Sequence, residues 1–194
     1  MRLEDKEAKK EESTNPVMGD KLLKTRSVML SGEINKESAE KIITQLLILE
    51  QEDSEKEIKI FINSPGGDVD AGYAIYDMVR FISCPVIMIG AGLVASAASL
   101  VLIAVPKERR IGLPNSTYLI HQPMSGMKGV ASDIEIYSKQ IEQLRLKLDT
   151  AIAVATGKSV EEVKKDTERD HWLFSEQAKE YGLIDRIVEN RKDL

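Results

Sequence analysis

The sequence predicts an α/β layer fold, and two observations support that prediction. Short apolar segments rich in β-branched residues alternate along the chain with segments whose apolar residues recur at helical spacing. One of the short segments, 86–89, is apolar at every position, which is typical of a strand covered on both faces of a parallel sheet. A repeating strand–helix order places helices on the faces of such a sheet.

The first half of the chain supplies three predicted strand–helix pairs. A short strand at 28–30 precedes a helix that Asn35 can cap, and that helix carries one apolar stripe, Ala39, Ile42, Ile43, Leu46 and Leu47. A strand at 58–62 ends at a Ser-Pro-Gly-Gly turn and is followed by a helix at 71–81. The strand at 86–89 leads to a helix at 95–105 that is apolar nearly all round, as a buried helix is.

The second half is predicted to contain a strand at 118–120 and one long helix at 132–156. The apolar residues of this helix follow a 3-4 spacing that suits packing against another helix, on this chain or on a second subunit: Ile134, Tyr137, Ile141, Leu144, Leu148, Ala151 and Ala155. Gly157 can end the helix.

The C-terminal region is predicted to contain two short helices and a closing strand. Ser159 and Glu162 have the spacing of a capping box, and Ser175 can cap a helix that ends at Gly182. Residues 183–188 are predicted to form the last strand.

Length and composition indicate one domain, 17–194, preceded by a charged, flexible tail at 1–16. The formal net charge is −5, so bulk charge gives no support for nucleic-acid binding. The longest nearly apolar run, 93–105, is shorter than the ~20 residues that span a bilayer. The lone Cys84 excludes an intramolecular disulfide and fits a reducing compartment. We therefore expect a cytoplasmic protein without a membrane or nucleic-acid partner.

Ser96 is a candidate nucleophile because it lies where an apolar strand gives way to a helix. At such a position, unpaired backbone N–H groups of the first helical turn lie near the hydroxyl, and the N–H of Ala97 can serve as an oxyanion donor. The alternative is that this run of small residues only allows close packing. Ser99 is a rival that lies deeper in the predicted helix.

His121 is a candidate general base because it follows a strand and begins a loop with Pro123 and Gly126, and functional residues concentrate in such loops. The other histidine, His171, directly follows Asp170. Adjacent residues of an extended segment face opposite ways, so Asp170 is better oriented toward a remote His121 than toward His171. Two histidines without a metal-ligand spacing give little support for a metal site.

Asp170 is the candidate carboxylate that would hold the imidazole in the required tautomer, with Asp166 and Glu168 as competitors. The pair Gly66-Gly67 has no Gly-Lys-Ser/Thr continuation, so it does not match a phosphate loop. We expect an oxyanion turn instead, in which the N–H of Gly67 faces the N–H of Ala97.

Taken together, these segments resemble the ClpP family of Clp protease proteolytic subunits from about Met29 to Val188. The strongest matches are 62–67, 95–96, 113–116, 120–123, 132–136, 166–170 and 180–185. The resemblance implies a crotonase-like α/β fold with a protruding handle formed by a long helix and a strand. It also implies two stacked heptameric rings around a chamber that a Clp-family ATPase supplies with unfolded polypeptide.

The resemblance assigns a role to each matched position. Ser96 matches the nucleophile, His121 the base, Asp170 the orienting acid, and Gly67 and Ala97 the oxyanion donors. The residues that match peptide-clamping strands are Gly66, Asp68, Val69, Asp70, Pro123, Met124, Ser125 and Gly126, and Arg169 matches a contact between subunits. Peptide hydrolysis by this set requires no metal or cofactor, since ATP is used by the partner.

Three departures from the family pattern leave alternatives open. The usual N-terminal pore segment is not evident, Lys59 stands where an aromatic residue often helps to bind the ATPase, and Met124-Ser125-Gly126 replaces a more glycine-rich turn. The chain could therefore be a catalytically idle or activity-modulating ring subunit that needs a second ClpP isoform. An acyl-CoA hydratase or isomerase of the crotonase type is a further alternative.

Overall fold

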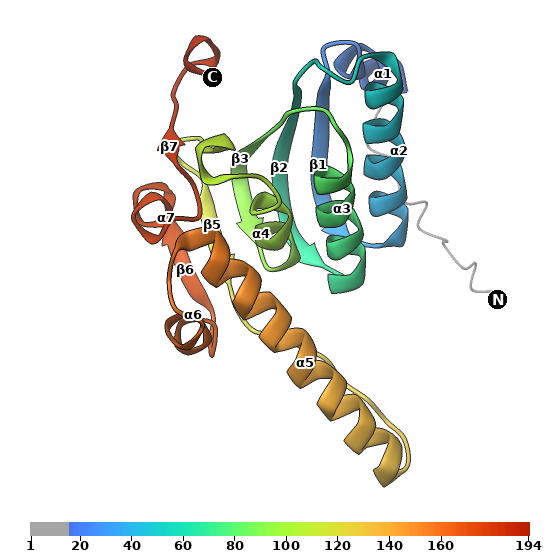
Figure 1. Cartoon of the computed structure of the whole chain (residues 1–194), viewed down its shortest axis with the longest axis vertical. Coiled ribbons are helices and arrows are strands. Elements are labelled where there is room, and N and C mark those ends of the chain that lie inside the picture. Colours follow the sequence, from blue (N-terminus) through green and yellow to red (C-terminus); the bar gives the residue numbers. More distant parts are fainter. Residues whose placement is uncertain (1–15) are drawn as a thin grey trace, which may run out of the picture.

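A computed structural model describes residues 16–194, which form a seven-stranded sheet with helices around it (Figure 1). The strands are β1 (Ser27–Ile34), β2 (Ile58–Gly67), β3 (Val86–Ala95), β4 (Arg110–Gly112), β5 (Thr117–Ile120), β6 (His171–Phe174) and β7 (Arg186–Ile187). The order β1-β2-β3-β4-β7 is parallel throughout, β5 joins β3 in parallel, and β6 joins β5 antiparallel. The α/β prediction is confirmed.

The helices are α1 (Pro16–Leu23), α2 (Lys36–Glu52), α3 (Val69–Phe81), α4 (Ala97–Leu102), α5 (Ala131–Thr156), α6 (Val160–Asp166) and α7 (Ser175–Tyr181), with short 3-10 turns at Lys107–Arg109 and Arg191–Asp193. The predicted caps of α2 and α6 are confirmed, because Asn35 and Ser159 each form a capping box. None of the helices in the described range is long and apolar enough to cross a membrane. The predicted tail at 1–16 lies outside the described residues except for Pro16, where α1 begins.

Several predicted boundaries were wrong for identifiable reasons. Strand β2 does not end before the glycine turn but continues to Gly67, where it still pairs with β1. Helix α3 begins at Val69 because the Asp68 carboxylate accepts the Ala71 N–H at 2.7 Å. Helix α4 begins after Ala95, which is still paired to β5, and it ends at Leu102, beyond which the Ala104 N–H makes a tighter turn to the Val101 carbonyl at 3.1 Å.

Two C-terminal predictions were also wrong. Ser175 is the first residue of α7 and does not cap it, since its Oγ lies 2.8 Å from the carbonyl oxygen of Leu113 and 2.9 Å from that of Ser116. Strand β7 has two residues because the Leu183 N–H donates back to the Ala178 carbonyl at the end of α7. For Ser175 the competing hydrogen bonds come from a distant segment of the chain, and for Leu183 the competing bond is local.

Strand β3 pairs with a different neighbour in each half, and this splitting creates the site region. Its first half pairs with β4 and its second half with β5, with Gly92 in a positive-φ conformation between them. Strands β2, β3 and β5 are parallel, so their carboxyl ends, Gly67, Ala95 and Ile120, meet at one edge of the sheet. In open parallel sheets this edge is where ligands bind.

Helix α5 extends away from the body, and residues 122–130 run beside its first half (Figure 1). We call residues 122–147 the handle. Most of the handle is exposed, whereas Leu148, Ile152 and Ala153 are buried against the body. The predicted apolar stripe of α5 is therefore buried against the body only along the C-terminal half of the helix.

Candidate active site

Ser96 sits in a strained turn between β3 and α4. Its φ is +56°, a conformation that among the described residues other than glycine is shared only by Arg26. The Ser96 N–H donates to the Leu119 carbonyl at 2.9 Å, and the Ser96 carbonyl accepts from Ser99 and Leu100. Strain of this kind persists only where the surroundings enforce it, and strand-to-helix turns of this kind expose nucleophilic serines in hydrolases.

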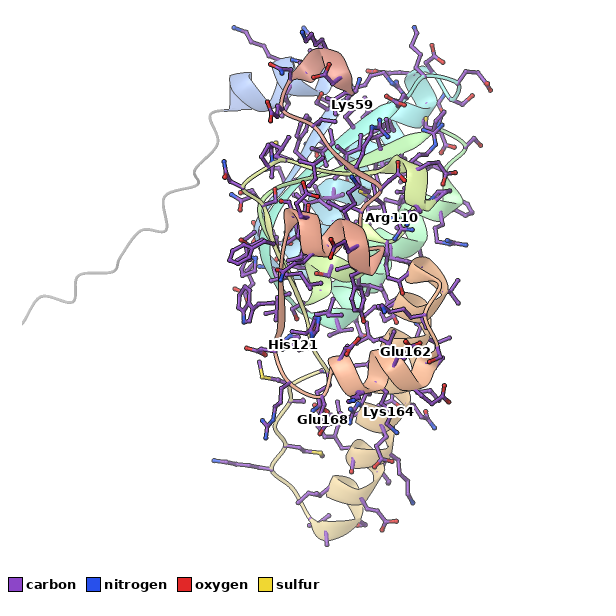
Figure 2. The ribbon with its side chains drawn as sticks, turned by 90° about the vertical axis from the view of Figure 1, so that its left-hand side faces the viewer. Lys59, Arg110, His121, Glu162, Lys164 and Glu168 are labelled. Atoms are coloured by element: carbon purple, nitrogen blue, oxygen red, sulfur yellow. The ribbon has the colours of Figure 1, made fainter. Side chains whose placement is uncertain are left out.

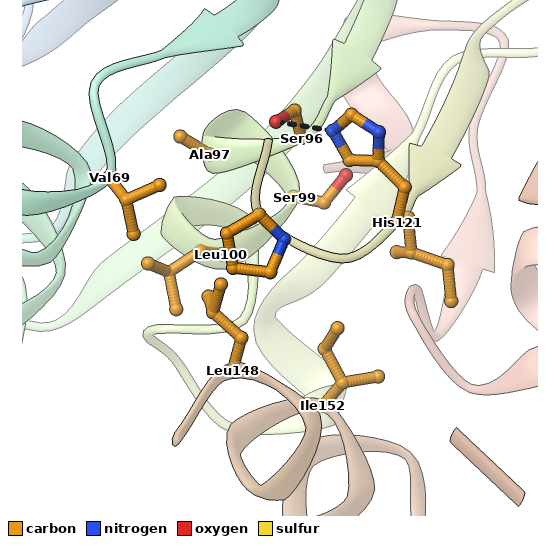
Figure 3. Close-up of a pocket in the computed structure, with 10 residues that line it drawn as sticks. Val69, Ser96, Ala97, Ser99, Leu100, His121, Leu148 and Ile152 are labelled. Carbon is orange, nitrogen blue, oxygen red and sulfur yellow. Dashed lines mark hydrogen bonds between the residues drawn. The ribbon is translucent and has the colours of Figure 1, made fainter. Parts of the chain in front are cut away.

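Ser96, His121 and Asp170 form a continuous hydrogen-bonded chain. The Ser96 Oγ lies 2.8 Å from His121 Nε2, and His121 Nδ1 lies 3.1 Å from Asp170 Oδ1 (Figure 3 shows the first contact). The antiparallel β5–β6 ladder ends at Ile120 and His171, so one step further along the same register brings His121 opposite Asp170. This is the arrangement in which a carboxylate orients an imidazole that accepts the serine proton.

The side chains that competed for the three catalytic roles make other contacts. Ser99 is buried, and its Oγ lies 2.9 Å from the carbonyl oxygens of Val94 and Leu119. Asp166 accepts a hydrogen bond from the Tyr181 hydroxyl at 2.9 Å, and His171 packs its ring against that of Tyr181. The Arg145 guanidinium donates to the Glu168 carboxylate at 2.6 Å and lowers the pKa of Glu168 below its usual range.

The glycine turn at the end of β2 lies directly against the Ser96 turn. A Cβ atom on Gly66 would lie 2.5 Å from the Ala95 carbonyl oxygen, 2.7 Å from the Ser96 Cβ and 2.8 Å from the Ala97 nitrogen, and Gly66 has a φ of +87°. Only a glycine can occupy this position without displacing the serine turn. The backbone at Gly66 thus lies near the Ala97 nitrogen, whereas a Cβ on Gly67 would clash with the Ile34 carbonyl oxygen of β1. The oxyanion roles of Gly67 and Ala97 stay predictions.

A small pocket with mainly apolar walls opens beside Ser96 and His121 (Figure 3). Val69 and Pro123, both predicted to contact substrate, line it. Leu100, Leu148 and Ile152 also line it, and the sequence did not predict that they would. The helical stripe had included Leu148, but the pattern could not show which end of the long helix faces the site.

The other residues predicted to contact substrate have varied positions. Asp68 and Asp70 belong to the cap and first turn of α3 rather than to a strand. Met124, Ser125 and Gly126 are exposed and lead away from the pocket along the handle. Arg169 is exposed two residues after the buried Thr167. The substrate and subunit contacts of these residues stay predictions.

No cluster of three or more potential metal ligands occurs among residues 16–194. The site therefore consists of a serine, an imidazole, a carboxylate and nearby backbone N–H groups. This set of groups is suited to acyl transfer.

The sequence profile of the Clp protease family matches residues 9–191. The chain belongs to the Clp protease family. It is 54% identical over 190 residues to the ATP-dependent Clp protease proteolytic subunit 2 of Treponema denticola, covering 98% of this chain and 95% of the relative. It is 55% identical over 183 residues to the protein of the same description from Treponema pallidum, covering 94% and 92%.

Among solved structures, a mutant of ClpP1 from Listeria monocytogenes superimposes with a TM-score of 0.84 at 46% identity, covering 90% of this chain and 98% of that one. The ClpP-type fold is thereby confirmed. As a member of the Clp protease family, the chain is a Clp-type serine peptidase.

Proposed function

We propose that this chain is a serine endopeptidase subunit of a chamber protease, and that it hydrolyses unfolded polypeptide with Ser96, His121 and Asp170. The observation that carries the proposal is the pair of contacts at 2.8 Å and 3.1 Å that joins the three side chains. Ser96 Oγ attacks the scissile carbonyl carbon while His121 Nε2 takes the hydroxyl proton. His121 then gives that proton to the leaving amine, and water hydrolyses the acyl-enzyme by the same route.

The backbone around Ser96 supplies the remaining catalytic groups in this proposal. The N–H groups of Ala97 and Gly67 stabilise the negative oxygen of the tetrahedral intermediate, an effect for which one donor contributes about 3 to 4 kcal/mol in comparable enzymes. An extended substrate pairs with the backbone at Gly66–Gly67 and at 123–126, as strands add to a sheet edge. The pocket floored by Leu100, Leu148 and Ile152 then accepts a small or apolar side chain.

We further propose that the chain assembles into two stacked heptameric rings that a Clp-family ATPase supplies with substrate. The family membership supports an oligomer and an ATPase partner. The exposed apolar side chains on the projecting helix, Ile134 and Ile136 at 45% and 67% exposure, fit a role in contacts between rings. Peptide hydrolysis itself needs no cofactor in this proposal, and the ATPase uses the ATP.

A second candidate is that full activity requires another ClpP isoform in the rings. Two relatives are described as proteolytic subunit 2, a numbering that fits more than one proteolytic subunit. Lys59 stands where the family often has an aromatic residue that helps to bind the ATPase. Because Lys59 is charged and forms an ion pair with Glu57 at 3.5 Å, we expect the ATPase to bind differently at this position. A crotonase-type hydratase or isomerase receives no support from the Ser–His–Asp arrangement.

The experiment is ATP-dependent degradation of a fluorescent unfolded polypeptide by the purified chain with a Clp ATPase, with and without a second ClpP isoform. We expect degradation that requires Ser96, so Ser96→Ala should abolish the contribution of this chain. Activity of mixed rings that is unchanged by Ser96→Ala would favour an idle ring subunit. A rate unchanged by adding the other isoform would exclude the second candidate.

A further inference from the structure

A groove lies between α3, the C-terminal half of α5 and the segment that follows α4. Its volume is about 530 Å³, which is within the range of small-molecule sites in proteins. None of the residues that line it also lines the pocket at Ser96 and His121. The groove is therefore separate from the candidate active site and large enough for a ligand of its own.

Part of the groove wall is apolar. Ile103 and Val105 are buried, whereas Val154 on α5 is 81% exposed. The apolar residues that line the groove are Ile103, Val105, Pro106, Ala151, Val154 and Ala155. This wall offers apolar surface that the apolar part of a ligand can cover.

Four cationic side chains from different parts of the chain line the same groove. Arg80 belongs to α3, Lys107 and Arg110 to the segment that follows α4, and Lys147 to α5. Within residues 16–194, Asp77 is the one carboxylate that lines it. Because the whole chain has a net charge of −5, the excess of positive charge here is local and favours an anionic ligand.

Two of these cations lie over tyrosine rings and not beside carboxylates. Lys147 Nζ is 3.6 Å from the centroid of the Tyr73 ring, and Arg80 Cζ is 5.5 Å from that of Tyr76. In the part of the chain that the structure describes, no cation of the groove lies within ion-pair distance of a carboxylate. A ring face holds a cation in place without cancelling its charge.

Arg110 adds a buried charge that only neutral groups contact. It is 2% exposed, and its Nη atoms donate to the carbonyls of Gly182, Leu183 and Ala155 at 2.8 to 3.3 Å. Its Nε and the Tyr73 hydroxyl have no hydrogen-bond partner among the described residues, and both can donate. Burial lowers the pKa of Arg110 below its usual range, so a nearby anion would stabilise its charged form. Figure 2 shows Arg110 in the body, well above the projecting handle.

We propose that this groove binds an amphipathic anion, a small molecule that carries a carboxylate on an alkyl chain of medium length. The carboxylate is bound by Arg80, Lys107 and Lys147, and the alkyl chain covers the apolar wall. An anion without an apolar chain would leave that wall exposed to water. A cation of the same length would be repelled by the positive side chains. The site lies outside the proposed peptidase chemistry, and its occupation does not involve Ser96.

Isothermal titration calorimetry of the full-length chain with decanoate, below the concentration at which it forms micelles, tests this proposal. We expect saturable binding with about one decanoate per chain. Acetate has the same carboxylate without the chain, and decyltrimethylammonium has the same chain with the opposite charge. Each should bind at least about tenfold more weakly than decanoate. Equal affinities for decanoate and decyltrimethylammonium, or no saturable binding of decanoate, would overturn the inference.

The double variant Arg80→Gln with Lys147→Gln shows where decanoate binds. Both side chains are exposed, so we expect the variant to fold and to bind decanoate about tenfold or more weakly, because two charged donors are lost. Lys139→Gln is the matched control, since Lys139 is an exposed lysine of α5 that pairs with Glu135 away from the groove. It should leave the affinity unchanged. Wild-type affinity in the double variant would overturn the inference.

A second cavity, of about 330 Å³, provides a further control of location. Phe61 and Ile89 contribute apolar surface to it, and Arg191 contributes a positive charge. Arg191→Gln should therefore leave decanoate binding unchanged. Loss of binding in Arg191→Gln would place decanoate in that second cavity and would overturn the inference. Calorimetry measures binding alone, so each outcome is independent of whether the chain is an active peptidase.

Discussion

At the scale of single residues, the close approach of Gly66 to Ser96 constrains the serine turn most tightly. An alanine at 66 would have to adopt a φ of +87° and would place its Cβ 2.7 Å from that of Ser96. We expect Gly66→Ala to lower peptide hydrolysis by about a hundredfold or more, because the serine turn must move. The measurement is kcat/KM with a fluorogenic peptide.

Gly32→Ala is the matched control for this prediction. Gly32 also has a positive φ, +78°, but a Cβ there would meet nothing within 4 Å. It should cost only about 1 to 2 kcal/mol of stability from backbone strain and leave kcat/KM close to wild type. Equal losses of activity in both variants would show that strain, and not the contact with Ser96, explains the effect of Gly66→Ala.

Much of the site could be predicted from the sequence at this scale, and the missing part has a clear physical reason. Ser96 and His121 were candidates because of their positions at strand ends, whereas Asp170 competed with Asp166 and Glu168, and the resemblance to the ClpP family assigned the three roles. The structure brings the three side chains together. The sequence could not reveal that Asp149 on α5 and Thr167 just after α6 are buried, because a buried polar residue has the same local sequence pattern as a solvated one. Only the tertiary contact between α5 and the end of α6 distinguishes them.

At the scale of elements, Arg26 holds the end of α2 against the start of β1 and β2. Its guanidinium donates to the carbonyls of Leu49, Asp53, Lys56 and Glu57 at 2.9 to 3.2 Å. One of its nitrogens also lies 3.3 Å from the sulfur of the buried Cys84. These bonds give donors to carbonyls in the last turn of α2 and in the loop that leads from it to β2, and they hold that loop against the start of β1.

We expect Arg26→Lys to lower the free energy of unfolding by about 2 to 3 kcal/mol, since an ammonium cannot reach four carbonyls from one point. Urea unfolding at fixed protein concentration measures this. Lys56→Gln is the control, because it removes only an exposed ion pair with Asp53 and should cost less than about 1 kcal/mol. A loss for Arg26→Lys no larger than for Lys56→Gln would contradict the assigned role of Arg26.

The sequence predicted the presence of helices and strands where the spacing of apolar residues was regular. It did not predict where many of them begin and end. The helices starting after Asn35 and Ser159 were located by their caps, which act locally. The extension of β2 through Pro65 to Gly67 was missed because it depends on pairing with β1, a contact between distant segments. The same reason explains why β3 was expected to end six residues too early.

At the scale of the whole molecule, buried tyrosines make the fold sensitive to alkaline pH. Burial raises the pKa of Tyr118 to about 12 and that of Tyr73 to about 12. In the unfolded chain these phenols ionise near pH 10. Above that pH the unfolded state loses protons that the folded state retains, so the free energy of unfolding falls as the pH rises from about 10 to about 12.

Urea unfolding at pH 9 and at pH 11.5 measures this dependence. Tyr118→Phe removes one of the two phenols, so its stability should fall less steeply with pH than that of the wild type. Between pH 9 and pH 11.5, the free energy of unfolding should fall by about 2 kcal/mol less in Tyr118→Phe than in the wild type. Identical slopes for the two proteins would show that Tyr118 does not contribute.

Covalent labelling by a fluorophosphonate would show whether Ser96 is an aligned and activated nucleophile. In that reaction the Ser96 oxygen bonds to phosphorus, fluoride leaves and His121 accepts the proton. Mass spectrometry of the intact chain, followed by peptide mapping, should find one adduct on Ser96 that is lost in His121→Ala. Absence of the adduct from the wild-type chain, alone and mixed with a second ClpP isoform, would show that Ser96 is not an activated nucleophile.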